Sequence, residues 1–419
     1  MSSVETQRTL DALWRIESPK LIAGLSRIVR DVGVAEELAQ DAFVSALAQW
    51  PESGIPRNPG AWLMAVAKRR AIDRFRREDL RERKHQELAR DHQLQRLGES
   101  DTDTRDDDID DDLLRLIFIA CHPVLSADAR VALTLRLLGG LSTGQIARAF
   151  LVAEPVVAQR IVRAKRTLSE ARVPFEVPNA AEREARLASV LGVLYLIFNE
   201  GYAASAGDDV LRPQLCDDAL RLGRVLAQLL PDDPEVNALV ALMEIQASRA
   251  SARVNASGEP ILLLDQDRGK WDQLLIRRGL AALERAEGLG GASGPYALQA
   301  AIAACHARAA TPDQTDWTRI AALYDALVVV LPSPVVQLNR AVAVGMAYGA
   351  AAGLELVDAL MSEPALKTYR LLPSVRGDLL EKLSRFGEAQ AEFSRAAELS
   401  QNARDRAVMR ERAARCARR

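Results

Sequence analysis

The spacing of apolar residues predicts a succession of helices along most of the chain. Residues 9–30 and residues 35–50 carry apolar side chains three and four positions apart, which places them on one face of an α-helix. Residues 61–67 are apolar on nearly every side, as is typical of a helix buried among other helices. Alternating runs of β-branched residues, which would indicate strands, are few. We therefore expect an all-α protein.

A long helix over residues 58–77 is expected to have a buried end and a basic end. Its apolar half is followed without a break by six cations: Lys68, Arg69, Arg70, Arg74, Arg76 and Arg77. Cations held on a rigid helix suit the binding of phosphates or of an acidic partner. The alternative is that they are only solvated, at the C-terminal end of a helix, where the helix dipole favours positive charge. Residues 51–60 contain three prolines and two glycines, so we expect a loop before this helix.

The helix at residues 35–50 follows a break at residues 31–33 and is expected to have one polar face. That face carries Glu36, Glu37, Gln40 and Asp41, opposite the apolar stripe. Further on, residues 78–112 hold fourteen acids against six bases. Residues 98–108 have almost no apolar content, so we expect a flexible linker there, and a solvated tether is its simplest role.

Composition narrows the possible functions. The 419 residues suffice for two or three domains, and a net charge of −2 means that any nucleic-acid contact comes from local patches. The four cysteines show no CxxC spacing, which argues for reduced thiols rather than disulfides or zinc. The sequence contains neither a signal-peptide apolar region nor an apolar run of about 18 residues. We expect a cytoplasmic protein with no membrane contact.

Residues 142–171 have the pattern of a helix-turn-helix. A helix over residues 126–138 ends at Gly139 and Gly140, and Ser142 with Gln145 then forms a capping box. A short helix (143–150), a turn (151–153) and a second helix (154–171) follow. On the second helix Val157, Ile161, Ala164 and Leu168 form the core stripe, which leaves an exposed polar face: Gln159, Arg160, Arg163 and Arg166. In a recognition helix, Arg suits guanine and Gln suits adenine.

About 240 residues follow and are expected to be helical, with a polar turn at residues 199–202 and a helix pair broken at residues 231–234. Phe386, Gly387, Ala389, Phe393 and Ala396 match a tetratricopeptide helix, and Ile320, Tyr324, Leu327 and Pro332 follow the same layout loosely. Asp265, Gln266, Asp267 and Arg268 form a polar cluster, for which capping plus a salt bridge is the simplest interpretation. No EF-hand, P-loop or dinucleotide spacing is present, so we expect no metal, no cofactor and no enzymatic activity.

The sequences AEELAQDAFVSALAQW and GAWLMAVAKRRAIDRFRR resemble region 2 of extracytoplasmic-function sigma factors, a group of the sigma-70 family (group 4). LSTGQIARAFLVAEPVVAQRIVRAKRTL resembles region 4 of the same family, with Gln145 where Glu is usual. FNEGY and LLDQDRGKWD resemble the long tetratricopeptide-like extension of one subgroup. The resemblance implies five segments: region 2 (1–80), an acidic linker (81–110), region 4 (111–175), a helical extension (180–290) and helical repeats (291–419).

The resemblance also implies partners and site residues. Core RNA polymerase would bind through its β′ clamp to Glu37, Gln40 and Asp41, and through its β flap to region 4. The implied minus-ten promoter contacts are Arg57, Asn58, Trp62, Lys68, Arg69, Asp73, Arg76 and Arg77. Gln159, Arg160, Arg163 and Arg166 would contact the minus-thirty-five element. Asp73 has two further interpretations: it orients Arg76 or Arg77, or it only pairs with Arg77.

The extension is expected to regulate the sigma domains in cis, in place of a separate anti-sigma protein. Asp265, Gln266, Asp267 and Arg268 would make the regulatory contact, and a regulatory protein on the C-terminal repeats is a further candidate partner. The sequence leaves open whether the extension inhibits or is required. The alternative function is a polymerase-independent helix-turn-helix regulator with a tetratricopeptide sensing domain.

Overall fold

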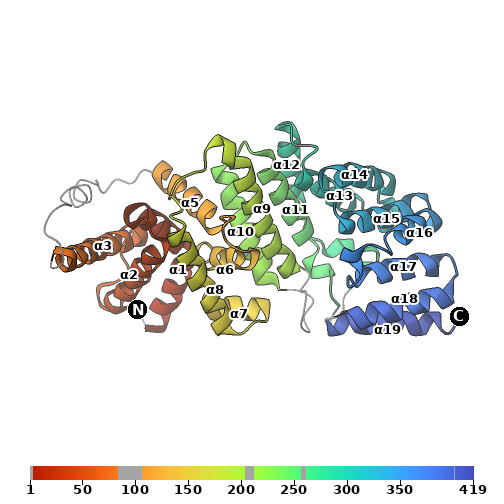
Figure 1. The fold of residues 1–419 in the computed structure, drawn as a ribbon, viewed down its shortest axis with the longest axis horizontal. Coiled ribbons are helices and arrows are strands. Elements are labelled where there is room, and N and C mark those ends of the chain that lie inside the picture. The colour runs from red at the N-terminus through yellow and green to blue at the C-terminus, as the bar shows by residue number, and fades with distance from the viewer. Residues whose placement is uncertain (1–2, 84–105, 203–211, 256–260, 401) are drawn as a thin grey trace. The chain divides into compact units, whose positions relative to one another are not determined.

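The computed structural model describes residues 3–83, 106–202, 212–255, 261–400 and 402–419. These residues form α-helices and short 3-10 helices without a strand, which confirms the all-α prediction (Figure 1). The chain folds into two compact units, Met1–Leu194 and Tyr195–Arg419. Within the described ranges, no helix combines the length and apolar character needed to cross a membrane.

The first unit begins with three helices, α1 (Ser3–Val29), α2 (Val32–Ser53) and α3 (Pro59–Arg83). The break before α2 is shorter than predicted, because Asp31 caps the helix by accepting from the backbone N–H of Val34 at 2.9 Å. The predicted loop at 51–60 is also too long. Helix α2 continues through Pro51 and ends where Gly54 takes a φ of +82°, and Pro59 begins α3, where its missing N–H costs nothing.

Among the described residues of this unit, the helices that follow are α5 (Asp106–Ala120), α6 (Ala127–Leu137), α7 (Thr143–Phe150), α8 (Glu154–Glu170) and the start of α9 (Ala180–Tyr202). The predicted linker is wrong at its end, because Asp106 and the acids after it form the first turn of α5. Negative charge is favourable at that end of a helix. The predicted linker is also wrong at its beginning, because residues 81–83 belong to α3, and residues 84–105 lie outside the described residues. The predicted stop of α6 is confirmed, with Gly140 at a φ of +68°.

Helix α9 contributes to both units, since the boundary falls between Leu194 and Tyr195. The predicted polar turn at residues 199–202 is wrong, because the helix continues to Tyr202. One turn of helix brings Phe198 beneath Tyr202, and their rings stack with centroids 5.6 Å apart. This stacking supports the helix through a segment whose polar residues suggested a turn.

The second unit is a series of helices in which each packs mainly against its neighbours in the chain (Figure 1). After α9 come α10 (Pro213–Leu229), α11 (Pro234–Ala247), α12 (Gln273–Gly288), α13 (Pro295–Arg308), α14 (Trp317–Val330), α15 (Pro334–Tyr348), α16 (Ala350–Ala359), α17 (Leu371–Lys382), α18 (Phe386–Leu399) and α19 (Ala403–Cys416). Short 3-10 helices lie between them, among them η1 (Ala250–Ala252), η2 (Leu263–Asp265) and η3 (Arg268–Lys270).

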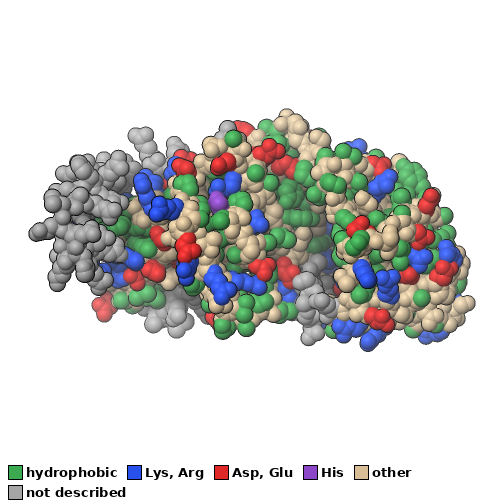
Figure 2. Space-filling model, in the orientation of Figure 1, with side chains coloured by type: hydrophobic (Ala, Val, Ile, Leu, Met, Phe, Trp, Pro, Cys, Tyr) green, Lys and Arg blue, Asp and Glu red, His purple; other side chains and the backbone are tan. Residues whose placement is uncertain are grey.

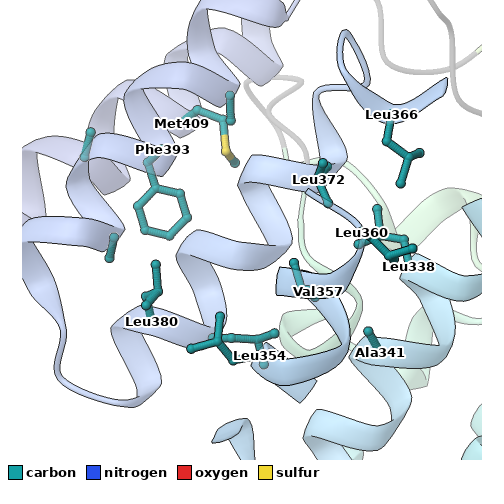
Figure 3. Close-up of a cluster of buried hydrophobic side chains, with 14 of the residues drawn as sticks. Leu338, Ala341, Leu354, Val357, Leu360, Leu366, Leu372, Leu380, Phe393 and Met409 are labelled. Atoms are coloured by element: carbon teal, nitrogen blue, oxygen red, sulfur yellow. The ribbon is translucent and has the colours of Figure 1, made fainter. Parts of the chain in front are cut away.

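The last five helices share one apolar core, to which side chains from each of them contribute (Figure 3). Ala389, Phe393 and Ala396 are fully buried there, at the positions that the tetratricopeptide pattern singled out. A Cβ at Gly377 would lie 2.8 Å from the Phe393 ring, so α17 and α18 approach each other closely at this glycine. Helices adjacent in sequence thus close the core of this unit.

Candidate nucleic-acid interface

The side chains of α3 face in three directions. Leu63, Ala67 and Ala71 recur every four residues and are buried against the rest of the unit. Arg70 and Arg74 reach α2, where they pair with acids. Among the remaining predicted contacts on α3, Trp62, Arg69, Asp73 and Arg76 follow one another at spacings of seven, four and three and so share one face, and the half-buried Lys68 lies to one side of it. Arg77 lies at its edge and donates from Nε to the backbone carbonyl of Asp73 at 3.1 Å, not to the carboxylate.

The loop between α2 and α3 is anchored at both ends. Trp62 packs edge to face on the buried Trp50, with ring centroids 5.3 Å apart. Asn58 caps α3, since its Oδ1 accepts from the backbone N–H of Ala61 at 3.0 Å. The capping leaves the Asn58 amide nitrogen without a hydrogen bond among the described residues. Arg57 is exposed beside it. The predicted base-reading residues therefore lie at the start of the cationic face of α3.

The acidic face of α2 is neutralised by α3. Arg70 pairs with Asp41 at 2.9 Å and Arg74 pairs with Glu37 at 3.1 Å, in an antiparallel ladder. Both acids stay more than half exposed, at 55% for Asp41 and 67% for Glu37. Exposed pairs of this kind contribute at most about 1 kcal/mol each. A cationic partner can therefore replace the arginines at little cost.

Glu36 does not belong to this exposed face, where the sequence pattern placed it. Its side chain is only 3% exposed. Glu36 Oε1 accepts from Arg136 Nε on α6 at 2.6 Å and from Gln40 Nε2 at 2.8 Å, and its other oxygen is paired with Lys165 on α8. The sequence did contain a signal that Glu36 is buried. Glu36, Phe43 and Trp50 are spaced seven residues apart, so the carboxylate lies on the same face of the helix as the two buried aromatic residues.

The helix-turn-helix forms as predicted. Ser142 and Gln145 make the complete capping box at the start of α7, and Leu151 turns the chain with a φ of +52°. On α8 the buried residues are those of the predicted stripe: Val157, Ile161, Ala164 and Leu168. Local signals alone set this motif, which explains why each of its bounds could be predicted.

The polar side chains of α8 are not equally available. Arg160 pairs with Asp128 at 3.0 Å and Arg166 pairs with Glu170 at 2.7 Å. Gln159 and Arg163 are exposed and make no ion pair or hydrogen bond among the described residues. Of the four predicted contacts, these two can reach a base edge without giving up a partner.

Two further contacts join α1 to the helices of the second half of this unit. Asp112 on α5 has a side chain only 4% exposed and pairs with Arg27 on α1 at 3.0 Å. Trp14 on α1 donates from Nε1 to the carbonyl of Gly140 at 3.0 Å. Neither contact was predictable from local sequence, because the partners are far apart in the chain.

The first half of α9 is bound to α5 and α6. Ser189 donates from its hydroxyl to the carbonyl of Cys121 at 2.6 Å and accepts from Arg130 at 2.5 Å. Burial raises the pKa of the Cys121 thiol to about 11. It also lowers the pKa of His122, an effect that the nearby Arg186 reinforces. The beginning of the extension is therefore part of the helix-turn-helix unit.

The polar cluster of the extension is largely engaged within its own unit. Arg268 donates to the carbonyls of His306 and Ala309 and to Thr315 Oγ1, at 2.9, 2.5 and 2.9 Å. Asp267 caps η3 through the backbone N–H of Gly269. The capping part of the simple interpretation is confirmed, but among the described residues Arg268 forms no salt bridge. Asp265 and Asp267 remain exposed and available for a partner.

The described residues contain no cluster of His, Cys, Asp and Glu that could hold a metal ion. On the face drawn in Figure 2, acidic and basic side chains of the described residues are interspersed rather than gathered in one field. That face therefore offers no extended basic field among the described residues.

Three segments of the chain match known protein families. Residues 13–81 match sigma-70 region 2, and residues 115–168 match sigma-70 region 4. Residues 186–287 match a family of unknown function (DUF6596). The first two matches cover α1 to α3 and the helix-turn-helix, whereas the third lies in the extension.

Comparison with curated proteins gives relatives of two kinds. The chain is 44% identical over 397 residues to a protein of Rhizobium meliloti described as uncharacterized, with 94% of this chain and 92% of that protein covered. It is 30% identical over 174 residues to the probable ECF RNA polymerase sigma factor SigI of Mycobacterium tuberculosis, covering 42% of this chain and 59% of SigI. It is also 29% identical over 143 residues to the ECF RNA polymerase sigma factor SigK of a Mycobacterium species, covering 32% and 68%. No solved structure matches the chain.

Proposed function

Because this chain belongs to the extracytoplasmic-function sigma factors and carries a C-terminal helical extension, we propose that it binds core RNA polymerase and directs it to a two-part promoter. One observation carries the proposal. The same unit presents an exposed acidic face on α2 and, on α8, the exposed side chains of Gln159 and Arg163, which have no ion pair or hydrogen bond among the described residues.

The acidic face supports the polymerase contact. Glu37, Gln40 and Asp41 lie on one face of α2, and Arg70 and Arg74 hold the two acids through exposed ion pairs. A basic surface on the β′ clamp would compete for the same carboxylates. Region 4 would contact the β flap.

The loop and outer face of α3 support the minus-ten contact. Lys68, Arg69, Arg76 and Arg77 would hold phosphates of the melted strand, and Trp62 offers a ring at the start of this face. Asn58 has a free amide nitrogen next to the exposed Arg57, so these two residues would read a base. Asp73, which accepts from Arg77 only through its backbone, keeps its carboxylate for a base amine or for Arg76.

At the minus-thirty-five element, Gln159 and Arg163 would read bases in the major groove. Arg160 and Arg166 would give up intramolecular pairs to do so, and we assign them to phosphates. This division refines the sequence prediction, which treated the four side chains alike.

The extension would regulate these domains in cis, in the cytoplasm. Within the Asp265–Arg268 cluster, the exposed Asp265 and Asp267 are the side chains available for a regulatory contact, because Arg268 and Gln266 are bound inside the extension. The helical repeats offer a surface for a regulatory protein.

Run-off transcription with purified core polymerase on the gene's own upstream region tests the sigma function. A product is expected with the full-length chain, and Glu37→Ala combined with Asp41→Ala should abolish both the product and polymerase pull-down. DNA binding without any product, and pull-down unaffected by the double variant, would instead favour the polymerase-independent regulator.

The sign of cis regulation is tested by a truncation after Leu194. Cutting nearer residue 178 would remove the α9 residues bound to α5 and α6, so loss of activity there would report damage to region 4. Higher activity after truncation at Leu194 indicates inhibition, lower activity indicates requirement, and no change contradicts regulation by the remaining extension.

A further inference from the structure

Three arginines of the second unit lie against two aromatic rings and have no acidic partner. The guanidinium carbon of Arg249 is 5.7 Å from the ring centroid of Tyr202 and 5.8 Å from that of Trp271. The guanidinium carbon of Arg253 is 3.7 Å from the Tyr202 ring. That of Arg268 is 5.1 Å from the Trp271 ring. None of the three forms an ion pair with a carboxylate of the described residues, so this set, the arginine cluster, concentrates unpaired positive charge.

Buried nitrogen atoms in and beside the arginine cluster lack hydrogen-bond partners among the described residues. They are Arg249 Nε, Arg268 Nε, Trp271 Nε1 and His306 Nδ1. Trp271 is only 3% exposed and His306 only 7%. Arg268 links these two residues, because it lies against the Trp271 ring and donates from Nη1 to the backbone carbonyl of His306 at 2.9 Å. Buried polar atoms are almost always hydrogen-bonded in folded proteins, so several unpartnered nitrogens in one place indicate a missing acceptor.

The arginine cluster cannot remove its charge by losing protons. Arginine stays protonated in proteins, whereas a buried lysine can become neutral. Burial lowers the pKa of Arg268, and the charge of Arg249 lowers it further, as expected for cations that face each other without an acid between them. Stacking on aromatic rings offsets only part of the cost of holding such cations together. An anion is the partner that would offset the rest.

A hollow of about 380 Å³ borders the arginine cluster at Tyr202. Tyr202 and Ala250 are among the residues that line it, and Arg249 directly precedes Ala250 and lies against the Tyr202 ring. Most of the lining is apolar and comes from α10, α11 and α12, with Leu220 and Leu275 as its largest aliphatic side chains. Hollows of this size and character bind small molecules.

The other charged side chains that line the hollow differ from the arginine cluster. Arg224 is already paired, since its Nε donates to the buried carboxylate of Glu244 at 2.8 Å. Asp217 is exposed. The side of the hollow at Tyr202 is therefore the one that borders unpaired positive charge.

We propose that the second unit binds a small phosphorylated molecule, with its phosphate on the arginine cluster and its apolar part in the hollow. A phosphate fits better than a carboxylate because it has more acceptor oxygens. The N–H groups without a hydrogen bond are those of the Arg249 guanidinium, Arg268 Nε and Trp271 Nε1. This inference does not rest on the proposed sigma function, since every residue of the site lies within residues 195–419.

Binding can be measured by hydrogen exchange and mass spectrometry on the full-length chain. The probes are inorganic phosphate and acetate, each compared with potassium chloride of the same ionic strength. Peptides that cover residues 245–255 and 266–276 report on the site. Phosphate should slow their exchange saturably, by about tenfold once its concentration is nine times the dissociation constant. Acetate should bind more weakly than phosphate, and potassium chloride should have no effect.

Arg249→Gln removes the guanidinium that has no hydrogen bond and should weaken phosphate binding by about tenfold or more, as expected for charge-assisted hydrogen bonds. Arg278→Gln, at an exposed arginine of α12, is the matched control and should bind phosphate as the parent protein does. If Arg249→Gln fails to fold, Trp271→Phe decides, because it keeps an aromatic ring and removes only the indole N–H. Phosphate binding should then weaken several-fold.

Equal slowing by phosphate and by potassium chloride would overturn the site. So would an unchanged phosphate affinity in Arg249→Gln, or in Trp271→Phe where that variant has to decide. A loss of affinity in Arg278→Gln as large as in Arg249→Gln would show diffuse attraction by surface charge and would also overturn it. Tighter binding of acetate than of phosphate would contradict the assignment to a phosphate group.

Discussion

The contacts inside the first unit of this protein differ in kind from those inside the second unit. In the first unit (the sigma unit, Met1–Leu194), helices far apart in the chain pack together, as α1 and α5 do, and the buried ion pair of Glu36 and Arg136 joins residues 100 positions apart. In the second unit, helices that follow one another in sequence share apolar cores, as α15 to α19 do around Phe393. Contacts between sequence neighbours need little loop closure, so each helix pair stabilises itself and the next.

This difference indicates which contacts between helices can break while the helices stay folded. Apolar burial is lost whenever neighbouring helices separate, whereas a charged contact can exchange its partner for water or for another protein. We therefore expect the polar contacts of α2 with α6 and α8 to exchange partners while the helices that carry them remain folded. The second unit should instead resist partial opening and unfold with loss of its core.

Removing Phe393 should give the largest effect on stability. Phe393→Ala deletes a fully buried ring that Gly377 and Arg412 contact, and should cost the second unit about 3–5 kcal/mol. Hydrogen exchange measured by mass spectrometry should show faster exchange across α15 to α19 and no change in α1 to α8. Phe386→Ala, at a partly exposed ring, is the control and should cost less. Faster exchange confined to α18 would contradict a shared core.

Acid should destabilise the second unit through His306. Burial, and then Arg249 and Arg268, lower the pKa of His306 to about 4, below its ordinary value near 6.5. Because the unfolded chain takes up the proton first, stability is lost as the pH falls from about 6.5 to about 4, by on the order of 3 kcal/mol. His306→Gln should flatten this part of a urea-unfolding pH profile followed on the second unit, whereas His122→Gln, in the first unit, should leave the second unit's profile unchanged. Equal profiles for the parent and His306→Gln would show that the residue titrates normally.

Promoter binding should distinguish the free from the paired arginines of α8. Arg163→Ala should cost about 1–3 kcal/mol at one base pair and relax specificity there. Arg166→Ala should weaken binding similarly on all sequences, because this side chain is assigned to a phosphate. Fluorescence anisotropy with duplexes selected from a randomised pool measures both. Base-specific loss in Arg166→Ala would reverse the assignment and show that the pair with Glu170 opens on DNA.

The smallest effect is expected at the capping box. Ser142→Ala removes the side-chain acceptor for the Gln145 N–H and should cost about 1 kcal/mol, felt only in α7. Amide exchange in α7 should rise roughly fivefold, while α15 to α19 are unchanged. Ser169→Ala, at an exposed site on α8, controls for loss of a hydroxyl. Wider changes would show that α7 is coupled to the rest of the sigma unit more tightly than its polar contacts suggest.

The helix-turn-helix could be predicted residue by residue because its signals are local. Ser142 and Gln145 lie three apart, and the stripe from Val157 to Leu168 needs only the helical period. The all-α class and the packing of the last helices followed from similar patterns. In contrast, the loop at residues 51–60 was misjudged, because Pro51 and Pro59 are compatible with the helix ends they occupy.

The contacts between helices could not be predicted in the same way. Glu36 appeared to be a surface acid, since its cations on α6 and α8 reach it only after the chain has folded. Likewise, the sequence offered Arg70 and Arg74 as two more free cations of α3. Their spacing of four matches that of Glu37 and Asp41, which indicates a ladder only once α2 and α3 are known to be antiparallel. The roles of these residues therefore depend on tertiary structure.

Helix α9 has a consequence for how this protein can be divided in evolution or by design. Its first half is bound to Cys121 and Arg130, whereas Tyr195 near its middle donates to Gln299 of the second unit. No recombination point between residues 180 and 202 separates the halves without exposing apolar surface. An extension transplanted onto another sigma factor would need the whole helix and the region 4 surface that receives it. The extension and region 4 are therefore expected to be inherited together, as one module.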